Sequence, residues 1–329
     1  MHYNPEICIM LATFNGESFL AEQIDSIREQ TYTKWILLVR DDGSHDNTNA
    51  IISTYSQLDS RIRIVSDDTI NRNKACGNFS ILMTHAKNYH ADIFMCCDQD
   101  DIWLPQKIER QLQEFEKYLP SLSSPRPLLV HSDLEVVNDD LSQIAPSFIQ
   151  YMALKPKTQK PLISLFTQNM VTGCTMAFNR ALLDICLPIP KVAIMHDWWL
   201  AMTCALHGEI IFIDETLVRY RQHSTNTIGA QSYWRSVFSI HQWMKRWKQG
   251  NQYFYRTLAQ AQTLSESLAE NNKSKLFNEQ NNQLLEFVTI LKLPRISRLK
   301  SMLHLKLAQA NWLTNVVLVV RLLILSPLE

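Results

Sequence analysis

The segment IFMCCDQDDIW, residues 93–103, joins an apolar run to a cluster of acids and is the most informative stretch of the chain. Three apolar runs precede it, at 7–11 (ICIML), 35–39 (WILLV) and 62–65 (IRIV), and helix-like segments separate them. In residues 18–30, for example, apolar side chains recur at helical spacing. Apolar strands that alternate with helices predict an α/β fold, with a Rossmann-like, mostly parallel sheet and flanking helices.

The rest of the chain follows less regular patterns. A helix is predicted from Asp197 to His207, and the chain after residue 230 reads as helical, with a break near Pro294. Further strands are predicted at 127–132, 171–178, 210–213 and 217–221. We therefore expect an α/β domain over residues 1–230, in halves of about 1–125 and 126–230, and a helical region over 231–329.

Composition excludes several classes of protein. The chain has 329 residues, of which 46% are hydrophobic and 19% charged, so disorder is disfavoured. Met1 to Glu6 lack the features of a secretory signal, and no apolar stretch has membrane-spanning length, so we expect a cytoplasmic protein. Seven cysteines without CxxC spacing fit a reduced compartment and give no zinc pattern.

Charge is distributed unevenly along the chain. Residues 231–329 carry 13 Lys or Arg and five Asp or Glu, whereas the preceding residues carry 19 and 27. A basic tail on an acidic body is typical of a region that meets an anionic surface, although solvated helix faces give the same count.

Polar clusters follow three of the predicted strands: ATFNG at 12–16, RDDGS at 40–44 and DQDD at 98–101. Because the carboxyl ends of parallel strands share one edge of the sheet, these clusters predict a ligand site there. The first cluster lacks GxGxxG, which disfavours a nicotinamide dehydrogenase. The second also reads as an ordinary Asp-Gly turn.

The third cluster indicates a metal site. Mg²⁺ and Mn²⁺ prefer oxygen ligands and commonly bind one or two carboxylates together with substrate phosphates. Asp98 and Asp100 suit a metal-diphosphate complex, whereas we expect Asp101 to cap a helix that begins near Leu104.

The ordered set ATFNG, DDGS, GNF, DQDDIW, TGC, HDWW and YRQH, over residues 5–230, resembles the GT-A fold enzymes of glycosyltransferase family 2, and most of all its bacterial rhamnosyltransferases. The resemblance implies an inverting, metal-dependent transfer of a sugar, such as L-rhamnose from dTDP-rhamnose, to a saccharide or lipid-linked saccharide in cell-surface polysaccharide synthesis.

The resemblance also implies residue roles. For the nucleotide sugar these are Thr13, Asn15, Asp41, Asp42, Asn78 and Asp98. For Mn²⁺ or Mg²⁺ they are Asp98, Asp100 and His223.

Asp197, in HDWW, would be the general base that takes the proton of the acceptor hydroxyl, although it also stands where a helix cap would stand. Gly173, Trp198 and Trp199 would line the acceptor site. Both tryptophans also fit a buried core.

Two other functions remain alternatives. A sugar-phosphate nucleotidyltransferase would need a glycine-rich basic loop, where this chain has Asn15-Gly16-Glu17. A non-catalytic saccharide-binding module would tolerate the loss of Asp100 or Asp197. Processive family members carry QxxRW, whereas residues 242–247 read QWMKRW, one residue longer, so we expect a non-processive enzyme.

The tail contains two amphipathic segments. Ser232 to Gly250 interleaves tryptophans with Lys and Arg, and Trp312 to Leu325 is apolar but short for a span. We expect peripheral contact with the inner face of the plasma membrane, or packing on the catalytic domain or across a homodimer. No partner nucleic acid is expected.

Overall fold

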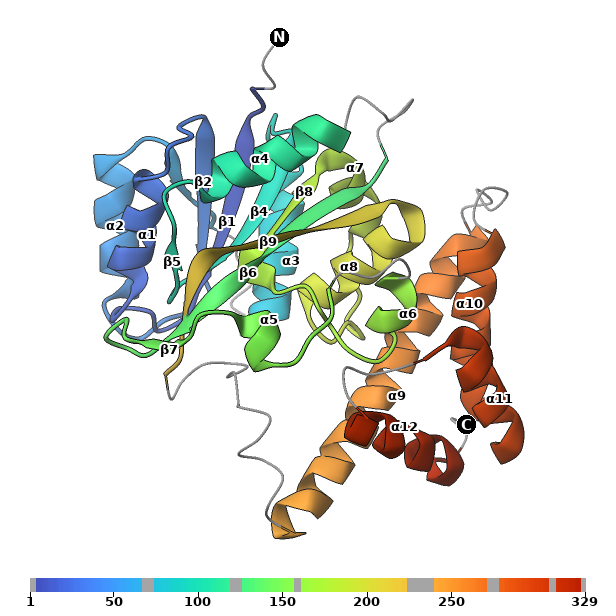
Figure 1. Ribbon diagram of the computed structural model, residues 1–329. Helices are drawn as coiled ribbons and strands as arrows, with labels where there is room; N and C mark the ends of the chain where they lie inside the picture. The colour runs from blue at the N-terminus through green and yellow to red at the C-terminus, as the bar shows by residue number, and fades with distance from the viewer. Residues whose placement is uncertain are drawn as a thin grey trace.

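The computed structural model describes residues 4–66, 74–118, 126–156, 161–223, 240–270, 278–307 and 312–326; of 240–246, 268–270 and 278 it describes the backbone alone. Its centre is a nine-stranded mixed sheet with the order β3-β2-β1-β4-β8-β6-β9-β5, and β7 pairs with β6 (Figure 1). The α/β fold with a C-terminal helical region is therefore confirmed.

The first half of the sheet is parallel, as predicted. Its strands are β1 (Ile7–Thr13), β2 (Trp35–Asp41), β3 (Ile62–Ile64) and β4 (Ile93–Asp98). β1 lies between β2 and β4, and β3 pairs with β2. Ile7, Ile9 and Leu11 enter one buried cluster while Cys8 and Met10 enter another, so both faces of this half are covered.

The second half introduces antiparallel pairs. Its strands are β5 (Ile102–Trp103), β6 (Leu128–Val137), β7 (Gln143–Ala145), β8 (Met176–Asn179) and β9 (Glu209–Arg221). β8 runs antiparallel to both β4 and β6, whereas β6 and β9 are parallel. The two predicted strands at 210–213 and 217–221 are one strand, β9. Of the predicted strand at 171–178 only the end is extended, because η2 (Gly173–Thr175) makes a 3₁₀ turn.

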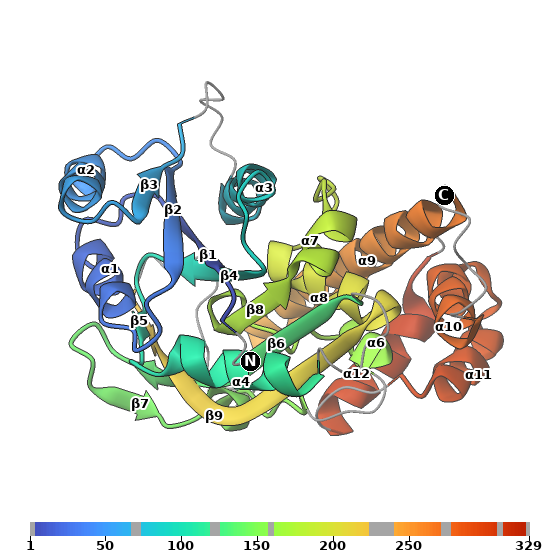
Figure 2. The same cartoon turned by 90° about the horizontal axis from the view of Figure 1, so that it is seen from above.

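Helices cover both faces of the sheet (Figures 1 and 2). One face packs on α1 (Leu20–Arg28), α2 (Thr48–Leu58) and α4 (Lys107–Tyr118). The other packs on α3 (Lys74–Ala86), α7 (Arg180–Cys186) and α8 (His196–His207). Two short helices, α5 (Phe148–Tyr151) and α6 (Pro161–Leu165), lie between strands of the second half.

Four helices form a block beside the sheet, drawn in orange and red in Figure 1. They are α9 (Ile240–Glu270), α10 (Asn278–Thr289), α11 (Arg295–Leu305) and α12 (Trp312–Ile324). Phe254 and Leu258 of α9 enter the same buried cluster as α8, and Phe287 stacks on Phe166 with ring centroids 4.2 Å apart. The block therefore shares a core with the α/β part.

Arg298 ties this block together. Its buried guanidinium donates hydrogen bonds to four backbone carbonyls, those of Leu291, Leu293, Leu322 and Leu325. Two of them belong to the last turn of α12 and the residue after it, where carbonyls have no partner within the helix. Among the described helices, none combines the length and apolarity needed to cross a bilayer.

Candidate active site

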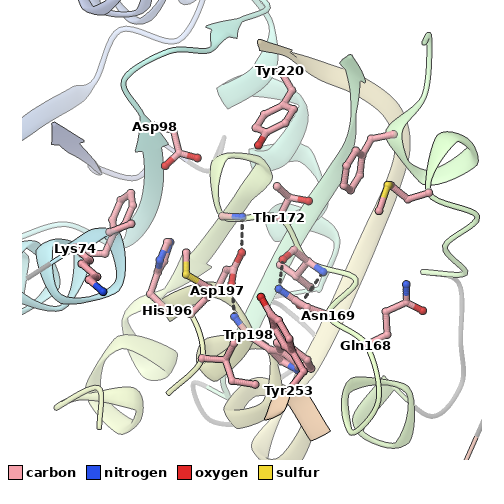
Figure 3. Close-up of a pocket in the computed structure, with 18 of the residues that line it drawn as sticks. Lys74, Asp98, Gln168, Asn169, Thr172, His196, Asp197, Trp198, Tyr220 and Tyr253 are labelled. Carbon is pink, nitrogen blue, oxygen red and sulfur yellow. Dashed lines mark hydrogen bonds between the residues drawn. The ribbon is translucent and has the colours of Figure 1, made fainter. Parts of the chain in front are cut away.

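A cavity of about 1110 Å³ begins at the carboxyl ends of β1 and β4 and extends to α9 and α12 (Figure 3). It exceeds the roughly 300–1,000 Å³ of typical small-molecule pockets, so it has room for more than one ligand. Its lining includes all of the residues predicted for the site except Asp41 and Trp199.

The loops after β1, β2 and β4 are bonded to one another. The backbone N–H of Asn15 donates to Ser44 Oγ at 2.7 Å, and Asn15 Oδ1 accepts from His45 N at 2.9 Å. Asn15 has φ 49°, in the left-handed region that Asn tolerates. Gln99, which follows β4, bonds both the N–H and the carbonyl of Phe14. The three loops therefore present one preformed surface.

A buried polar cluster supports this surface. Arg40 Nη1 donates to Asp42 Oδ1 at 3.1 Å and to Asn78 Oδ1 at 2.9 Å, and all three side chains are buried. Asn78 Nδ2 donates to the carbonyls of Thr13 and Arg40. The pairing with Arg40 compensates the buried charge of Asp42. Sequence reasoning missed Arg40, although a cation at the end of the apolar run WILLV was a usable signal.

Asp41 is not brought into the cavity. Its carboxylate accepts hydrogen bonds from the N–H groups of Gly43 and Ser44 and from the hydroxyls of Ser44 and Thr13. Gly43, with φ 88°, needs glycine at this turn. In this structure the Asp41 carboxylate therefore stabilises its own loop, and its contact with the nucleotide stays a prediction.

The three predicted metal ligands all line the cavity. Asp98 ends β4 and Asp100 follows it, and His223 Nε2 lies 2.7 Å from Asp100 Oδ2. Burial, together with the charges of Asp100 and Asp197, raises the pKa of Asp98 to about 7. Clustered carboxylates that repel one another, beside an imidazole, form a set that fits a divalent cation.

Asp101 has a different place from the one predicted. α4 begins at Lys107, too far along the chain for Asp101 to cap it. Asp101 is buried and accepts from the N–H of Arg221. Its carboxylate, that of Asp98 and the thiol of Cys174 lie within 4.8 Å of one another. Burial raises the pKa of Cys174 well above its usual value, so this group is a thiol and a weak metal ligand.

Asp197 lies deeper in the cavity, in the first turn of α8 (Figure 3). It accepts hydrogen bonds from Gly173 N at 3.1 Å and from Trp198 N at 2.6 Å. Burial raises its pKa to about 7, and these N–H groups oppose the rise. A carboxylate with a pKa near neutrality suits a general base, and the same residue satisfies an N–H of the helix start.

His196 was not singled out by the sequence. Its ring stacks on Phe79 with centroids 3.9 Å apart and lines the cavity beside Asp197. Among the described residues neither ring nitrogen has a hydrogen-bond partner. A Cβ at Gly173 would lie 2.8 Å from His196 Nε2, so Gly173 is needed for this close approach. Burial lowers the pKa of His196 to about 3, which keeps the ring neutral.

The two tryptophans separate. Trp198 lines the cavity, and its indole N–H donates to the carbonyl of Leu165 at 2.8 Å. Trp199 is buried in the core, where its indole N–H donates to the carbonyl of Cys186 at 2.9 Å. The structure therefore does not place Trp199 where it could stack on a sugar.

Comparisons with known proteins agree with this geometry. The family model described as Glycosyl transferase family 2 matches residues 8–184. An uncharacterized glycosyltransferase from Rickettsia prowazekii is 26% identical over 232 residues, which cover 68% of this chain and 66% of that protein. The chain thus spans slightly less than two thirds of that relative.

Two relatives have more specific names. The dTDP-rhamnosyl transferase RfbG of Shigella flexneri is 26% identical over 69% of this chain and 76% of its own length. WfgD of Escherichia coli, named as a UDP-Glc:alpha-D-GlcNAc-diphosphoundecaprenol beta-1,3-glucosyltransferase, is 28% identical over 54% and 62%.

Among solved structures, residues 1–349 of S. aureus TarS in complex with UDP-GlcNAc superpose with a TM-score of 0.57. The match has 14% identity and covers 88% of this chain and 74% of that TarS fragment. At that identity the match supports the fold.

Proposed function

The chain belongs to glycosyl transferase family 2, and we propose that it transfers a sugar from a nucleotide-sugar donor to a saccharide acceptor, with inversion and with a divalent metal ion. One observation carries the proposal. A carboxylate with a pKa of about 7, Asp197, faces the same cavity as the acids that end β4. One cavity thus holds a candidate base for the acceptor and a candidate metal site for the donor.

In this proposal each residue has a defined task. The loops of Thr13 and Asn15, supported by Asp42 and Asn78, hold the nucleotide. Asp98, Asp100 and His223 hold Mn²⁺ or Mg²⁺, which stabilises the negative charge of the leaving diphosphate. Asp197 accepts the proton of the attacking hydroxyl, and the nitrogens of His196, which have no hydrogen-bond partner among the described residues, bond sugar hydroxyls.

Finer assignments follow from the relatives. RfbG supports L-rhamnose from dTDP-rhamnose as the donor, and WfgD supports a lipid-linked saccharide as the acceptor. We propose a non-processive enzyme of cell-surface polysaccharide synthesis, with residues 1–230 as the catalytic domain and 231–329 as a helical region.

A panel of nucleotide sugars tests the proposal. Each is mixed with the protein and Mn²⁺, Mg²⁺ or excess chelator, and thermal stabilisation and donor hydrolysis are measured. A true donor stabilises the fold in proportion to its affinity, because it binds only the native state. We expect dTDP-rhamnose with a metal ion to raise the melting temperature and to be hydrolysed. If no nucleotide sugar stabilises the protein and none is hydrolysed, the proposal is wrong.

We also propose that the helical region contacts the inner membrane surface. The segment from Ser232 lies outside the described side chains except near its end, but α12 exposes Trp312, with 72% of its surface accessible. Full-length protein is co-sedimented with anionic and neutral vesicles. Trp312→Ser should reduce binding a few-fold. Leu58→Ser, which changes an equally exposed residue on α2, should not. If sedimentation is equal and negligible with both vesicle types, the membrane proposal is wrong. The helical region would then pack on the catalytic domain or across a homodimer.

A further inference from the structure

The cavity has a second end that donor and base do not occupy. Past Asp197 its wall comes from helices that are distant in the sequence. The apolar lining of the cavity includes Phe148, Met152, Leu154, Phe166, Phe254 and Val317. An apolar extension of this kind suits a ligand that has a hydrocarbon part.

One cation stands in this apolar wall. Arg321 of α12 is buried, and its Nε donates to Asn251 Oδ1 at 2.9 Å. Its guanidinium lies 5.6 Å from the ring of Trp247 and packs against Gly250, where a Cβ would clash with Nη2. No carboxylate pairs with Arg321 within the part of the chain that the structure describes. A buried cation without an anion is costly, so it is a good site for an anionic ligand.

The buried arginines of the helical block differ in this respect. All four hydrogen bonds of Arg298 go to backbone carbonyls, so its role is to join helices. Among the described residues Arg321 makes one hydrogen bond, through Nε, and its side chain lines the cavity. The planar guanidinium suits the oxygens of a phosphate group.

α12 presents three faces. Thr314, Val317 and Arg321 line the cavity, while Leu318, Leu322 and Leu325 beyond its end are buried. On the other side of the cavity face, an exposed stripe of four apolar residues follows helical spacing: Trp312, Val316, Val320 and Ile324. The cation is therefore next to apolar surface both inside and outside the cavity.

We propose that Arg321 binds the diphosphate of a lipid-linked acceptor, whose saccharide reaches Asp197 and whose hydrocarbon chain leaves along α12. This inference rests on the proposed transfer to a lipid-linked saccharide. The apolar stripe of α12 then continues the path of the chain into the membrane, so donor and membrane lie at opposite ends of one cavity.

Direct binding tests the site without turnover. Affinity for farnesyl diphosphate, farnesol and inorganic pyrophosphate is measured by calorimetry in excess chelator, which suppresses metal-dependent binding of diphosphates at the donor end. We expect farnesyl diphosphate to bind at least tenfold more tightly than either part alone. Pyrophosphate binding of equal strength, or no preference for the diphosphate over farnesol, overturns the proposal.

Variants separate this site from general charge and from folding. Arg321→Gln should weaken farnesyl diphosphate about tenfold to a hundredfold, the usual scale for a charge-assisted hydrogen bond, and Arg321→Lys should restore part of the loss. Lys300→Gln removes the same charge from an exposed site on α11 and should change nothing. If Arg321→Gln, Arg321→Lys and Lys300→Gln bind farnesyl diphosphate with equal affinity, the assignment to Arg321 is wrong.

The acceptor kinetics give a second readout. For a saccharide on a lipid diphosphate, Arg321→Gln should raise KM with kcat and donor hydrolysis unchanged, and for the same saccharide on a neutral alkyl chain it should change neither. Equal effects on both acceptors contradict the proposal. Failure of the proposed function looks different, because then the wild-type protein itself hydrolyses no nucleotide sugar while the binding test still gives its answer.

Discussion

The two ends of the cavity are built in different ways. The donor end, where we propose that the nucleotide sugar binds, comes from three short loops, 12–16, 40–44 and 98–101. Polar groups of these loops form hydrogen bonds with one another. The acceptor end comes from helices between residues 148 and 321, held by apolar packing around one cation. A site made of contiguous loops is specified by local sequence, whereas a wall made of separate helices is specified by the tertiary fold.

The largest effect should fall on Asp197, where the two ends meet. Asp197→Asn keeps the shape of the side chain but removes the base, so kcat should fall by about 10² to 10⁴. Affinity for the donor should change little, because the metal and nucleotide groups are elsewhere. Steady-state kinetics and donor titration on the same protein measure both.

Asp184→Asn is the matched control for Asp197, since it changes an exposed carboxyl of α7 that pairs with exposed Lys87. It should leave kcat intact. The ionised form of Asp197 is disfavoured by burial, so its neutral replacement should not lower the melting temperature at pH 8. Joint loss of fold and donor affinity would assign Asp197 to capping alone.

The donor end should respond next. Asp100→Asn removes a proposed metal ligand and weakens the contact with His223, so turnover should fall by about 10² to 10³. Excess chelator should reproduce the loss in the wild-type protein. Asp214→Asn, on exposed β9 surface, serves as control. Full turnover in chelator would remove the metal from the mechanism.

Gly173 links the two ends through contact rather than charge. A methyl group there would press on His196 Nε2 and displace the loop whose N–H bonds Asp197. Because small misplacements of catalytic groups are costly, Gly173→Ala should lower kcat about tenfold to a hundredfold. The variant Gly173→Ala with His196→Ala should recover part of the loss if the clash is the cause. No change in the single variant would show that the loop adapts.

A smaller effect is expected from pH. The carboxyl of Asp197 has its pKa raised to about 7, so it is protonated and inactive as a base below that pH. With saturating metal, kcat/KM should fall about fifteenfold as pH drops from 7 to 5.5, because the ionised fraction of Asp197 falls by that factor. The residual activity of Asp197→Asn should be flat over this range. A slope that survives the substitution assigns the titration to another group.

The sequence predicted well that three polar clusters share one edge of the sheet, because each motif lies at the end of one strand. Apolar runs fixed β1, β2 and β4, and the acids after β4 could only fall at the same edge. The sequence did not show that Asp41 lies outside the cavity lining, because an Asp-Gly turn and a ligand contact use the same type of residue. Trp199 was misplaced because its burial depends on α7, whose position the local pattern does not give.

The acceptor end could not be predicted from local pattern. Arg321 is 124 residues from Asp197 in the chain and reaches the cavity only because α12 lies across α9. Arg40 was within reach of prediction, since a charge beside two acids in a buried strand needs a partner. The sequence did not indicate His196, because only the tertiary structure shows that its two ring nitrogens have no hydrogen-bond partner among the described residues.

Arg298 affects how the helical block, α9 to α12, responds to temperature. One guanidinium sets the position of the end of α12 against α11, while the donor loops are tied to a nine-stranded sheet. On warming, the helical block should therefore unfold locally before the sheet does. Between those two temperatures we expect the nucleotide sugar to be hydrolysed by water and no longer transferred to the acceptor. Donor hydrolysis would then persist to a higher temperature than transfer.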